Sequence, residues 1–163
     1  MGLGASEGAT MFRALAVLAT IALCTSVALA QQDPIKDRKA LMKNNADQAK
    51  IGAGMVRGEQ PFDLAKAQKI FAEFENTATK AADLFPANSI NQATADDPYT
   101  ASPKIWQNMD DFKARLAKFG NDAKAASTSV KDLNSFKAAF ANIGKNDCGG
   151  CHDKFRLKNG RSD

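Results

Sequence analysis

The chain has 163 residues, of which 22 are Lys or Arg and 18 are Asp or Glu, so its formal net charge is +4 at pH 7. This charge is mild and is spread along the sequence without a dense basic run, so we expect no nucleic-acid partner. Once a short leader is set aside, the remaining length suits one compact domain.

Residues 1–30 are predicted to be a leader that is removed on export. Residues 11–13 form a short basic start, residues 14–27 are apolar, and residues 28–30 match an A-x-A cleavage site. The apolar run and its cleavage site cover about 17 residues, fewer than the ~20 that a membrane-spanning helix needs. We therefore expect a mature domain of residues 31–163, a periplasmic location and no stable membrane insertion. Residues 1–10 resemble neither leader nor domain, and a start of translation at Met11 would account for them.

The first helix is predicted over residues 34–57. Asp33 is a typical N-cap residue, Pro34 suits the first helical position, and Gly58 follows the expected end. Apolar residues recur at three- and four-residue steps or their multiples and form one stripe. The stripe consists of Ile35, Met42, Ala46, Ala49, Ala53 and Val56.

A second helix is predicted from about Asp63 to Phe85, because Pro61 precedes it and Pro86 follows it. Residues 86–102 contain Asn, Ser, Asp and Pro with little periodicity, which is typical of a loop. This loop is long enough to cross the end of a helical bundle. The apolar residues of the second helix are Leu64, Ala67, Ile70, Phe71, Phe74, Ala78 and Ala81.

A third helix is predicted to begin at Ser102 and Pro103 and to end at a short break over residues 127–129. A fourth apolar stripe starts at Leu133 and continues to Phe155. No stretch longer than a few residues shows strand alternation. The sequence therefore predicts an all-α fold, an antiparallel four-helix bundle with its cofactor site near the C-terminal helix.

The fourth helix carries Cys148-Gly149-Gly150-Cys151-His152, which matches C-x-x-C-H, the haem attachment signature of c-type cytochromes. Two thiols at this spacing each add to one vinyl group of the same porphyrin, and the adjacent histidine is placed to ligate the iron. His152 is the only histidine in the chain, and the motif holds the only cysteines beyond the leader. We therefore predict one covalently bound haem c, with His152 as the proximal axial ligand.

Two other uses of these residues are a zinc site and a thioredoxin-like dithiol. Structural zinc sites usually have four Cys or His ligands, and residues 31–163 offer three. A redox dithiol normally lies near a βαβ pattern, which is absent from this sequence. Haem attachment is the interpretation that fits best.

Beyond the motif, four segments resemble those of a known family: CGGCHDKFR (148–156), DRKALM (37–42), MVRGEQPFD (55–63) and SPKIW (102–106). Through them, residues 31–163 resemble the class II c-type cytochromes, the cytochrome c′ family, over essentially their whole length. The resemblance implies a four-helix bundle with haem at its C-terminal helix. Homodimers that form through the first two helices are common in this family, and whether this chain forms one is left open.

Met42 illustrates what the resemblance adds. A methionine on an apolar stripe is more often core packing than a metal ligand. In the family, however, the first helix contributes the residue that faces the iron opposite the histidine, and the resemblance implies that Met42 is this residue and the distal axial ligand. The branch that this chain most resembles has low-spin iron ligated by histidine and methionine, and its members are regarded as electron carriers. The alternative is the high-spin branch, in which the iron is five-coordinate and its open face binds nitric oxide or carbon monoxide.

Two arginines are candidates for contacts with the haem propionates, because guanidinium groups pair bidentately with carboxylates. Arg38 lies one turn before the methionine, and Arg156 lies one turn after the histidine. Each has a solvated surface arginine as its alternative. Trp106 and Phe155 are expected to pack on the porphyrin if they point inward.

The leading functional prediction is a periplasmic electron carrier with a redox protein as donor and another as acceptor. A basic patch of Lys154, Arg156, Lys158 and Arg161 suits an acidic redox partner, with a merely soluble C-terminal tail as the alternative. No pair of acidic residues and no serine–histidine arrangement indicates an enzyme. A purely structural helical module is a third interpretation, and it leaves the haem motif without a use.

Overall fold

The computed structural model describes residues 33–90 and 99–158, so the predictions for the leader and for Arg161 lie outside the described residues. The helices and turns of the described part are α2 (Pro34–Arg57), α3 (Leu64–Ala81), η1 (Ala87–Ser89), α4 (Lys104–Gln107), α5 (Met109–Ser129), α6 (Leu133–Asn142), η2 (Ile143–Gly149) and α7 (Gly150–Phe155). Two short strands, β1 (Tyr99–Ala101) and β2 (Arg156–Lys158), complete it.

Helix α2 begins and ends where the sequence predicts. The Asp33 carboxylate accepts hydrogen bonds from the amides of Ile35 and Lys36, at 3.0 and 3.1 Å, and so satisfies two amide groups at the helix start. Gly58 ends the helix in the left-handed conformation, with φ of 75°, which glycine adopts without a Cβ penalty.

Helix α3 begins after the predicted cap Asp63, whose carboxylate accepts a hydrogen bond from the Lys66 amide at 3.0 Å. It ends at Ala81, four residues before the predicted Phe85. The carbonyl of Leu84 accepts a hydrogen bond from Arg38 Nη1, at 3.2 Å, and the residue before a proline is disfavoured in the helical conformation. The chain therefore leaves the helix axis before Pro86.

The third predicted helix is divided at Asn108 into α4 and α5. Asn108 has non-helical backbone angles, φ −136° and ψ 48°, and its side chain donates a hydrogen bond to the Lys104 carbonyl at 3.1 Å. The break predicted over residues 127–129 is wrong, because α5 continues through Ser129. The hydroxyls of Ser127 and Thr128 bond back to the Lys124 carbonyl within the helix, so these polar residues do not end it.

The fourth predicted helix forms as one helical run from α6 through α7, and its middle is the π-helical segment η2. Asp132 and Ser135 cap its start reciprocally, because the Ser135 amide donates to the Asp132 carboxylate at 2.7 Å and the Ser135 hydroxyl bonds the Asp132 amide. Segments of π-helix are rare in proteins as a whole, and those that occur often lie at functional sites. Here the π-helical segment contains the first cysteine of the haem motif.

The strands β1 and β2 pair antiparallel, with Thr100 opposite Leu157. They tie the chain after α7 to the segment before α4, and the Ser102 amide adds a hydrogen bond to the Phe155 carbonyl at 2.9 Å. This pairing was not predicted, because three residues are too short to show an alternating pattern.

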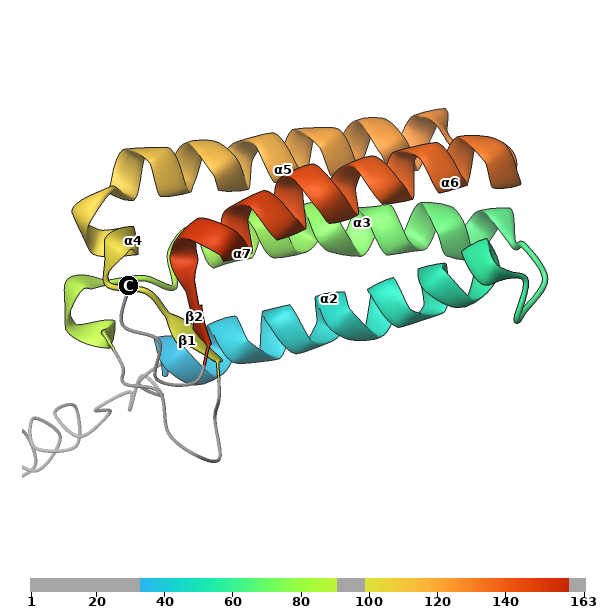
Figure 1. Ribbon diagram of the computed structural model, residues 1–163. Coiled ribbons are helices and arrows are strands. Elements are labelled where there is room, and N and C mark those ends of the chain that lie inside the picture. The colour runs from blue at the N-terminus through green and yellow to red at the C-terminus, as the bar shows by residue number, and fades with distance from the viewer. Residues whose placement is uncertain (1–32, 91–98, 159–163) are drawn as a thin grey trace, which may run out of the picture. The chain divides into compact units, whose positions relative to one another are not determined.

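The helices α2, α3, α5 and α6 lie side by side and alternate in direction along the chain, as Figure 1 shows. The main buried cluster contains Met55, Ile70, Phe71, Phe119 and Phe136, and a second cluster contains Ile105, Phe112 and Phe155. The described part is therefore an antiparallel four-helix bundle, as predicted. None of its helices has the length and apolar character needed to span a bilayer.

Candidate haem site

The motif lies on one helical turn that spans η2 and α7. Cys148 belongs to the π-helical segment, and Cys151 and His152 belong to the short helix that follows. All three side chains are half-buried, and the two thiols are not joined as a disulfide. Burial raises the pKa of Cys148 to about 11 and also raises the pKa of Cys151. Both thiols are therefore protonated at neutral pH, which makes them poor nucleophiles on their own.

A cavity of about 660 Å³ lies against the motif. Its walls come from α2, α3, α5 and the η2–α7 turn, and its apolar wall residues are Ala40, Met42, Ala46, Ala49, Phe74, Leu116 and Phe119. A smaller cavity of about 150 Å³ shares Met42, Cys151, His152 and Arg156 with it. The structure therefore brings the motif and Met42, more than 100 residues apart in sequence, to the walls of the same two cavities.

The residues at this site fit a covalently held haem. Two thiols, one imidazole and one thioether meet at an apolar cavity whose volume lies in the range of about 300–1,000 Å³ that is typical of cofactor sites. Soft sulfur and imidazole are the ligands that haem iron takes in cytochromes. Burial also lowers the pKa of His152, which favours the neutral imidazole that binds a metal.

Of the methionines in the described part, Met42 alone lines either of these two cavities. Met55 is 1% exposed and packs in the main core, and Met109 packs against the second cluster. The α2 stripe predicted from the sequence is therefore divided between two environments. Met42, Ala46 and Ala49 line the larger cavity, while Ala49 and Val56 pack against the main core.

Arg38 is buried at the edge of the smaller cavity. Its guanidinium donates hydrogen bonds to the Ser89 hydroxyl at 2.9 Å and to the Ser89 carbonyl at 2.8 Å. It also lies over the rings of Phe85, at 4.9 Å, and Trp106, at 5.8 Å. Burial lowers the pKa of Arg38. These contacts fix the guanidinium beside the cavity, and its contact with a propionate stays a prediction.

Of the other three residues predicted to contact haem, two line a cavity at the motif and one does not. Arg156 is exposed and lines both cavities, while Phe155 is buried and lines the smaller one. Trp106 lines neither of these two cavities, because its ring packs on Phe85 and its indole nitrogen donates a hydrogen bond to the Pro86 carbonyl at 3.1 Å.

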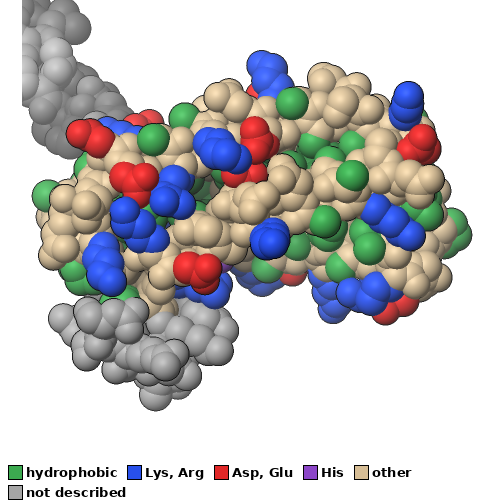
Figure 2. All heavy atoms as spheres, turned by 45° about the horizontal axis from the view of Figure 1, so that its top comes forward, with side chains coloured by type: hydrophobic (Ala, Val, Ile, Leu, Met, Phe, Trp, Pro, Cys, Tyr) green, Lys and Arg blue, Asp and Glu red, His purple; other side chains and the backbone are tan. Residues whose placement is uncertain are grey.

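The charged residues that line the larger cavity are Lys39, Lys43, Arg115, Arg156 and Asp147. On the face shown in Figure 2, lysine and arginine side chains alternate with aspartate and glutamate rather than forming a block of one sign. Lys154, a member of the predicted basic patch, forms an ion pair with Asp111 at 2.8 Å. The predicted patch is therefore partly neutralised on its described side.

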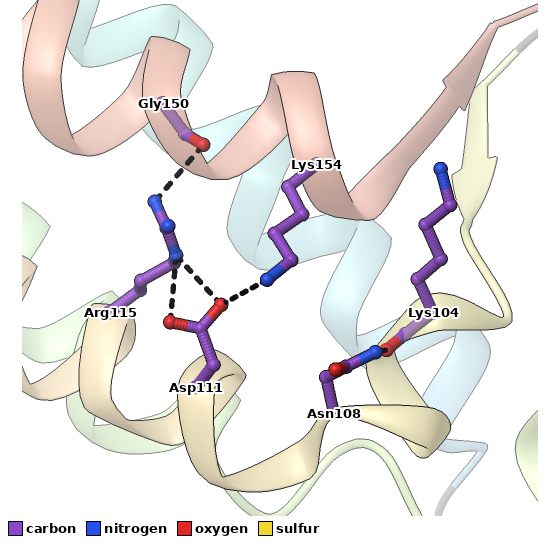
Figure 3. Close-up of polar contacts among 6 residues, drawn as sticks. All are labelled: Lys104, Asn108, Asp111, Arg115, Gly150 and Lys154. Carbon is purple, nitrogen blue, oxygen red and sulfur yellow. Dashed lines mark hydrogen bonds and ion pairs between the residues drawn. The ribbon is translucent and has the colours of Figure 1, made fainter.

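Sequence reasoning missed Arg115, which lines the larger cavity. Its Nε donates hydrogen bonds to both carboxylate oxygens of Asp111, at 3.2 and 3.1 Å, and its Nη1 donates to the Gly150 carbonyl at 3.3 Å (Figure 3). Lys154 and Arg115 together lower the pKa of Asp111 through these hydrogen bonds. The cluster therefore connects α5 to the helical backbone between the two cysteines. The four-residue spacing from Asp111 to Arg115 was the available signal.

Sequence reasoning also missed Asp147, which directly precedes the first cysteine. Its side chain is 1% exposed and lines the larger cavity. Oδ1 accepts a hydrogen bond from Lys118 Nζ at 2.6 Å, and Oδ2 has no hydrogen-bond partner among the described residues. Burial raises the pKa of Asp147, and the bond to Lys118 opposes this rise.

Comparisons with known proteins agree with one another. The family model described as "Cytochrome C'" matches residues 33–156. Cytochrome c-556 of Rhodopseudomonas palustris is 34% identical over 150 residues, which cover 92% of this chain and 100% of that protein. Cytochrome c′ of the same organism is 37% identical over 146 residues, which cover 90% of this chain and 97% of that protein.

Solved structures give the same result. Cytochrome c′ from Rhodopseudomonas palustris superposes with a TM-score of 0.71 at 37% identity, over 78% of this chain and 98% of that one. Oxidised cytochrome c556 from the same organism superposes with a TM-score of 0.70 at 35% identity, over 80% of this chain and 100% of that one.

Proposed function

The chain belongs to the cytochrome c′ family, and from this premise we propose that it is a periplasmic electron carrier whose haem iron is ligated by His152 and Met42. The cofactor of the family is covalently attached haem c, which supplies a one-electron centre when bound. Cys148 and Cys151 hold it in the proposed site, and the cavity between α2, α5 and the η2–α7 turn receives it.

The observation that carries this proposal is the position of Met42. It lines the same two cavities as the only histidine of the chain, and it comes from the opposite helix. When haem is bound, His152 and Met42 would hold its iron between an imidazole and a thioether, and a substrate would then have no direct access to the metal. A thioether ligand also stabilises the reduced form and raises the reduction potential, which suits transfer of electrons between proteins.

The chain's own residues also limit solvent access. Phe74, Leu116 and Phe119 form apolar wall from two helices, and such walls keep a redox centre in a low-dielectric environment. Electron transfer then proceeds by contact at the edge of the site, with redox proteins as donor and acceptor. The leader expected over residues 1–30 supports a periplasmic location.

A second candidate is a five-coordinate protein that binds nitric oxide or carbon monoxide. The cytochrome c′ relative, at 37% identity, favours the gas-binding function. The cytochrome c-556 relative, at 34% identity, favours the electron carrier about as strongly. In this case Met42 is part of the apolar wall and not a ligand.

Binding of carbon monoxide to the ferrous protein separates the two candidates. The carrier proposal predicts weak binding by the wild-type protein and ready binding by Met42→Ala, because the substitution removes the sixth ligand. Met109→Ala is the matched control, since that methionine packs outside both cavities, and it should behave as wild type. Strong binding by the wild-type protein, unchanged by Met42→Ala, would assign the gas-binding function instead.

A further inference from the structure

We infer that Asp147 holds a carboxylate in the wall of the haem site and that the negative charge of its ionised form lowers the reduction potential of the haem. This inference shares with the proposed function the attachment of haem at Cys148 and Cys151, but it does not depend on whether Met42 is a ligand.

The carboxylate of Asp147 is placed to act on the site and not on solvent. Its side chain is 1% exposed, it lines the larger cavity, and it immediately precedes the cysteine that we assign to haem attachment. Oδ2 is buried and has no hydrogen-bond partner among the described residues. A buried carboxylate oxygen without a partner is costly, so packing alone does not account for this side chain.

The cation that pairs with Asp147 compensates it only in part. Lys118 Nζ lies 2.6 Å from Asp147 Oδ1 and also 2.6 Å from Asp122 Oδ2, so one ammonium group is shared by two carboxylates. The Lys118 side chain is 57% exposed, and solvent therefore screens its charge more than that of Asp147. The other basic groups of the cavity wall are Lys39, Lys43, Arg115 and Arg156, none of which is buried.

The sign of the effect follows from the charge of the iron. Ferric haem carries one more positive charge than ferrous haem, so a nearby negative charge stabilises the ferric form. Interactions between charges are stronger in an apolar wall than in water. Asp147 therefore lowers the potential whichever axial ligands the iron has, and the contact with Lys118 sets the size of this effect.

Potentiometric titration of the haem-loaded protein tests the inference. We expect Asp147→Asn, which keeps the shape and removes the charge, to shift the potential upward without changing the ferric or ferrous absorption spectrum. Asp122→Asn is the matched control, because Asp122 bonds the same lysine but does not line either of the two cavities at the motif. Its shift should be clearly smaller. An unchanged or lowered potential in Asp147→Asn, or an equal shift in Asp122→Asn, would overturn the inference.

A second pair of variants keeps the test informative if Asp147→Asn fails to fold. Lys118→Gln removes the cation that compensates Asp147. At a pH high enough to keep Asp147 ionised, the potential should therefore fall further than in Lys124→Gln, whose lysine pairs with Glu75 at 3.7 Å. Equal shifts in these two variants would contradict the inference. The spectrum of the wild-type protein reports the axial ligands separately, so failure of the proposed function is distinguishable from failure of this inference.

Discussion

At Gly52, α2 comes into close contact with the Phe140 ring of α6, in the helical run that carries the haem motif. A Cβ atom at this position would lie 2.5 Å from Cε2 and 2.8 Å from Cζ of Phe140. The Phe140 ring is itself held against Phe136, with a centroid distance of 5.2 Å. The absence of a side chain at Gly52 therefore permits the approach of two helices that position the site.

We predict that Gly52→Ala lowers the free energy of unfolding by about 1–2 kcal/mol, because overpacking costs more than the roughly 1 kcal/mol that alanine contributes to a helix. Urea unfolding of the haem-loaded protein measures this change. Gly144→Ala is the control, since a Cβ atom there would meet nothing within 4 Å, and it should leave stability unchanged or raised. Stability of Gly52→Ala at or above the wild-type level would show that the contact is unimportant.

Single residues also show which parts of the site were predictable. Cys148, Cys151 and His152 are adjacent in sequence, so their spacing alone indicates their chemistry. Asp147 bonds Lys118, which lies 29 positions away in the sequence, and Arg115 bonds the Gly150 carbonyl, 35 positions away. No local pattern reports such contacts, and these two residues were missed for that reason. Their roles depend on how α5 packs against the fourth helix.

At the scale of elements, helix starts were predicted well where a capping residue was present. Asp33 and Asp63 cap α2 and α3 as expected, because a cap is a local interaction that the sequence records directly. The end of α3 and the break at Asn108 were not predicted, since they depend on the hydrogen bond from Arg38 to the Leu84 carbonyl and on non-helical angles at Asn108. The π-helical segment η2 has the apolar spacing of an ordinary helix and gave no separate signal.

The N-cap of α6 provides a prediction at this scale. Hydrogen bonds from the Ser135 amide and hydroxyl hold the pKa of Asp132 below its ordinary value of 3.8. Because the pKa is lower in the folded chain, Asp132 stabilises the fold above about pH 3.8, and this contribution is lost as the pH falls through the folded value. Asp132→Ala should therefore be less stable than wild type at neutral pH, and the difference should shrink in acid.

Urea unfolding of both proteins at neutral pH and at a pH below the folded value of Asp132 checks this dependence. Asp132→Asn serves as the control, because asparagine is also a good N-cap residue but does not titrate. Asp132→Asn should remain more stable than Asp132→Ala in acid as well as at neutral pH. A difference between wild type and Asp132→Ala that is independent of pH would exclude the carboxylate as its source.

At the scale of the whole described unit, the helices enclose a packed core along one part of their length and the candidate cofactor cavity along another part. Phe71, Phe136 and Met55 are almost fully buried in the core. Met42 and Ala46 of the same α2 helix line the cavity instead. The cofactor is therefore expected to stabilise the first half of α2 more than the second half.

Removal of the cofactor tests this expectation. In Cys148→Ala/Cys151→Ala, which cannot form the thioether bonds, we predict that amide protection falls at least about tenfold in the half of α2 that contains Met42. Protection near Met55 should change much less, because that turn packs in the core. Hydrogen exchange measures both halves of one helix, so each serves as the control for the other. A uniform loss along α2 would contradict the division of the helix.

The central claim is that His152 and Met42 together ligate the iron of an electron carrier. The absorption spectrum of the ferric wild-type protein at neutral pH tests it most directly. The account predicts a low-spin spectrum with the sulfur-to-iron charge-transfer band of methionine ligation, and loss of this band in Met42→Ala. A high-spin ferric spectrum without that band would contradict the claim and assign the protein to the gas-binding branch of its family.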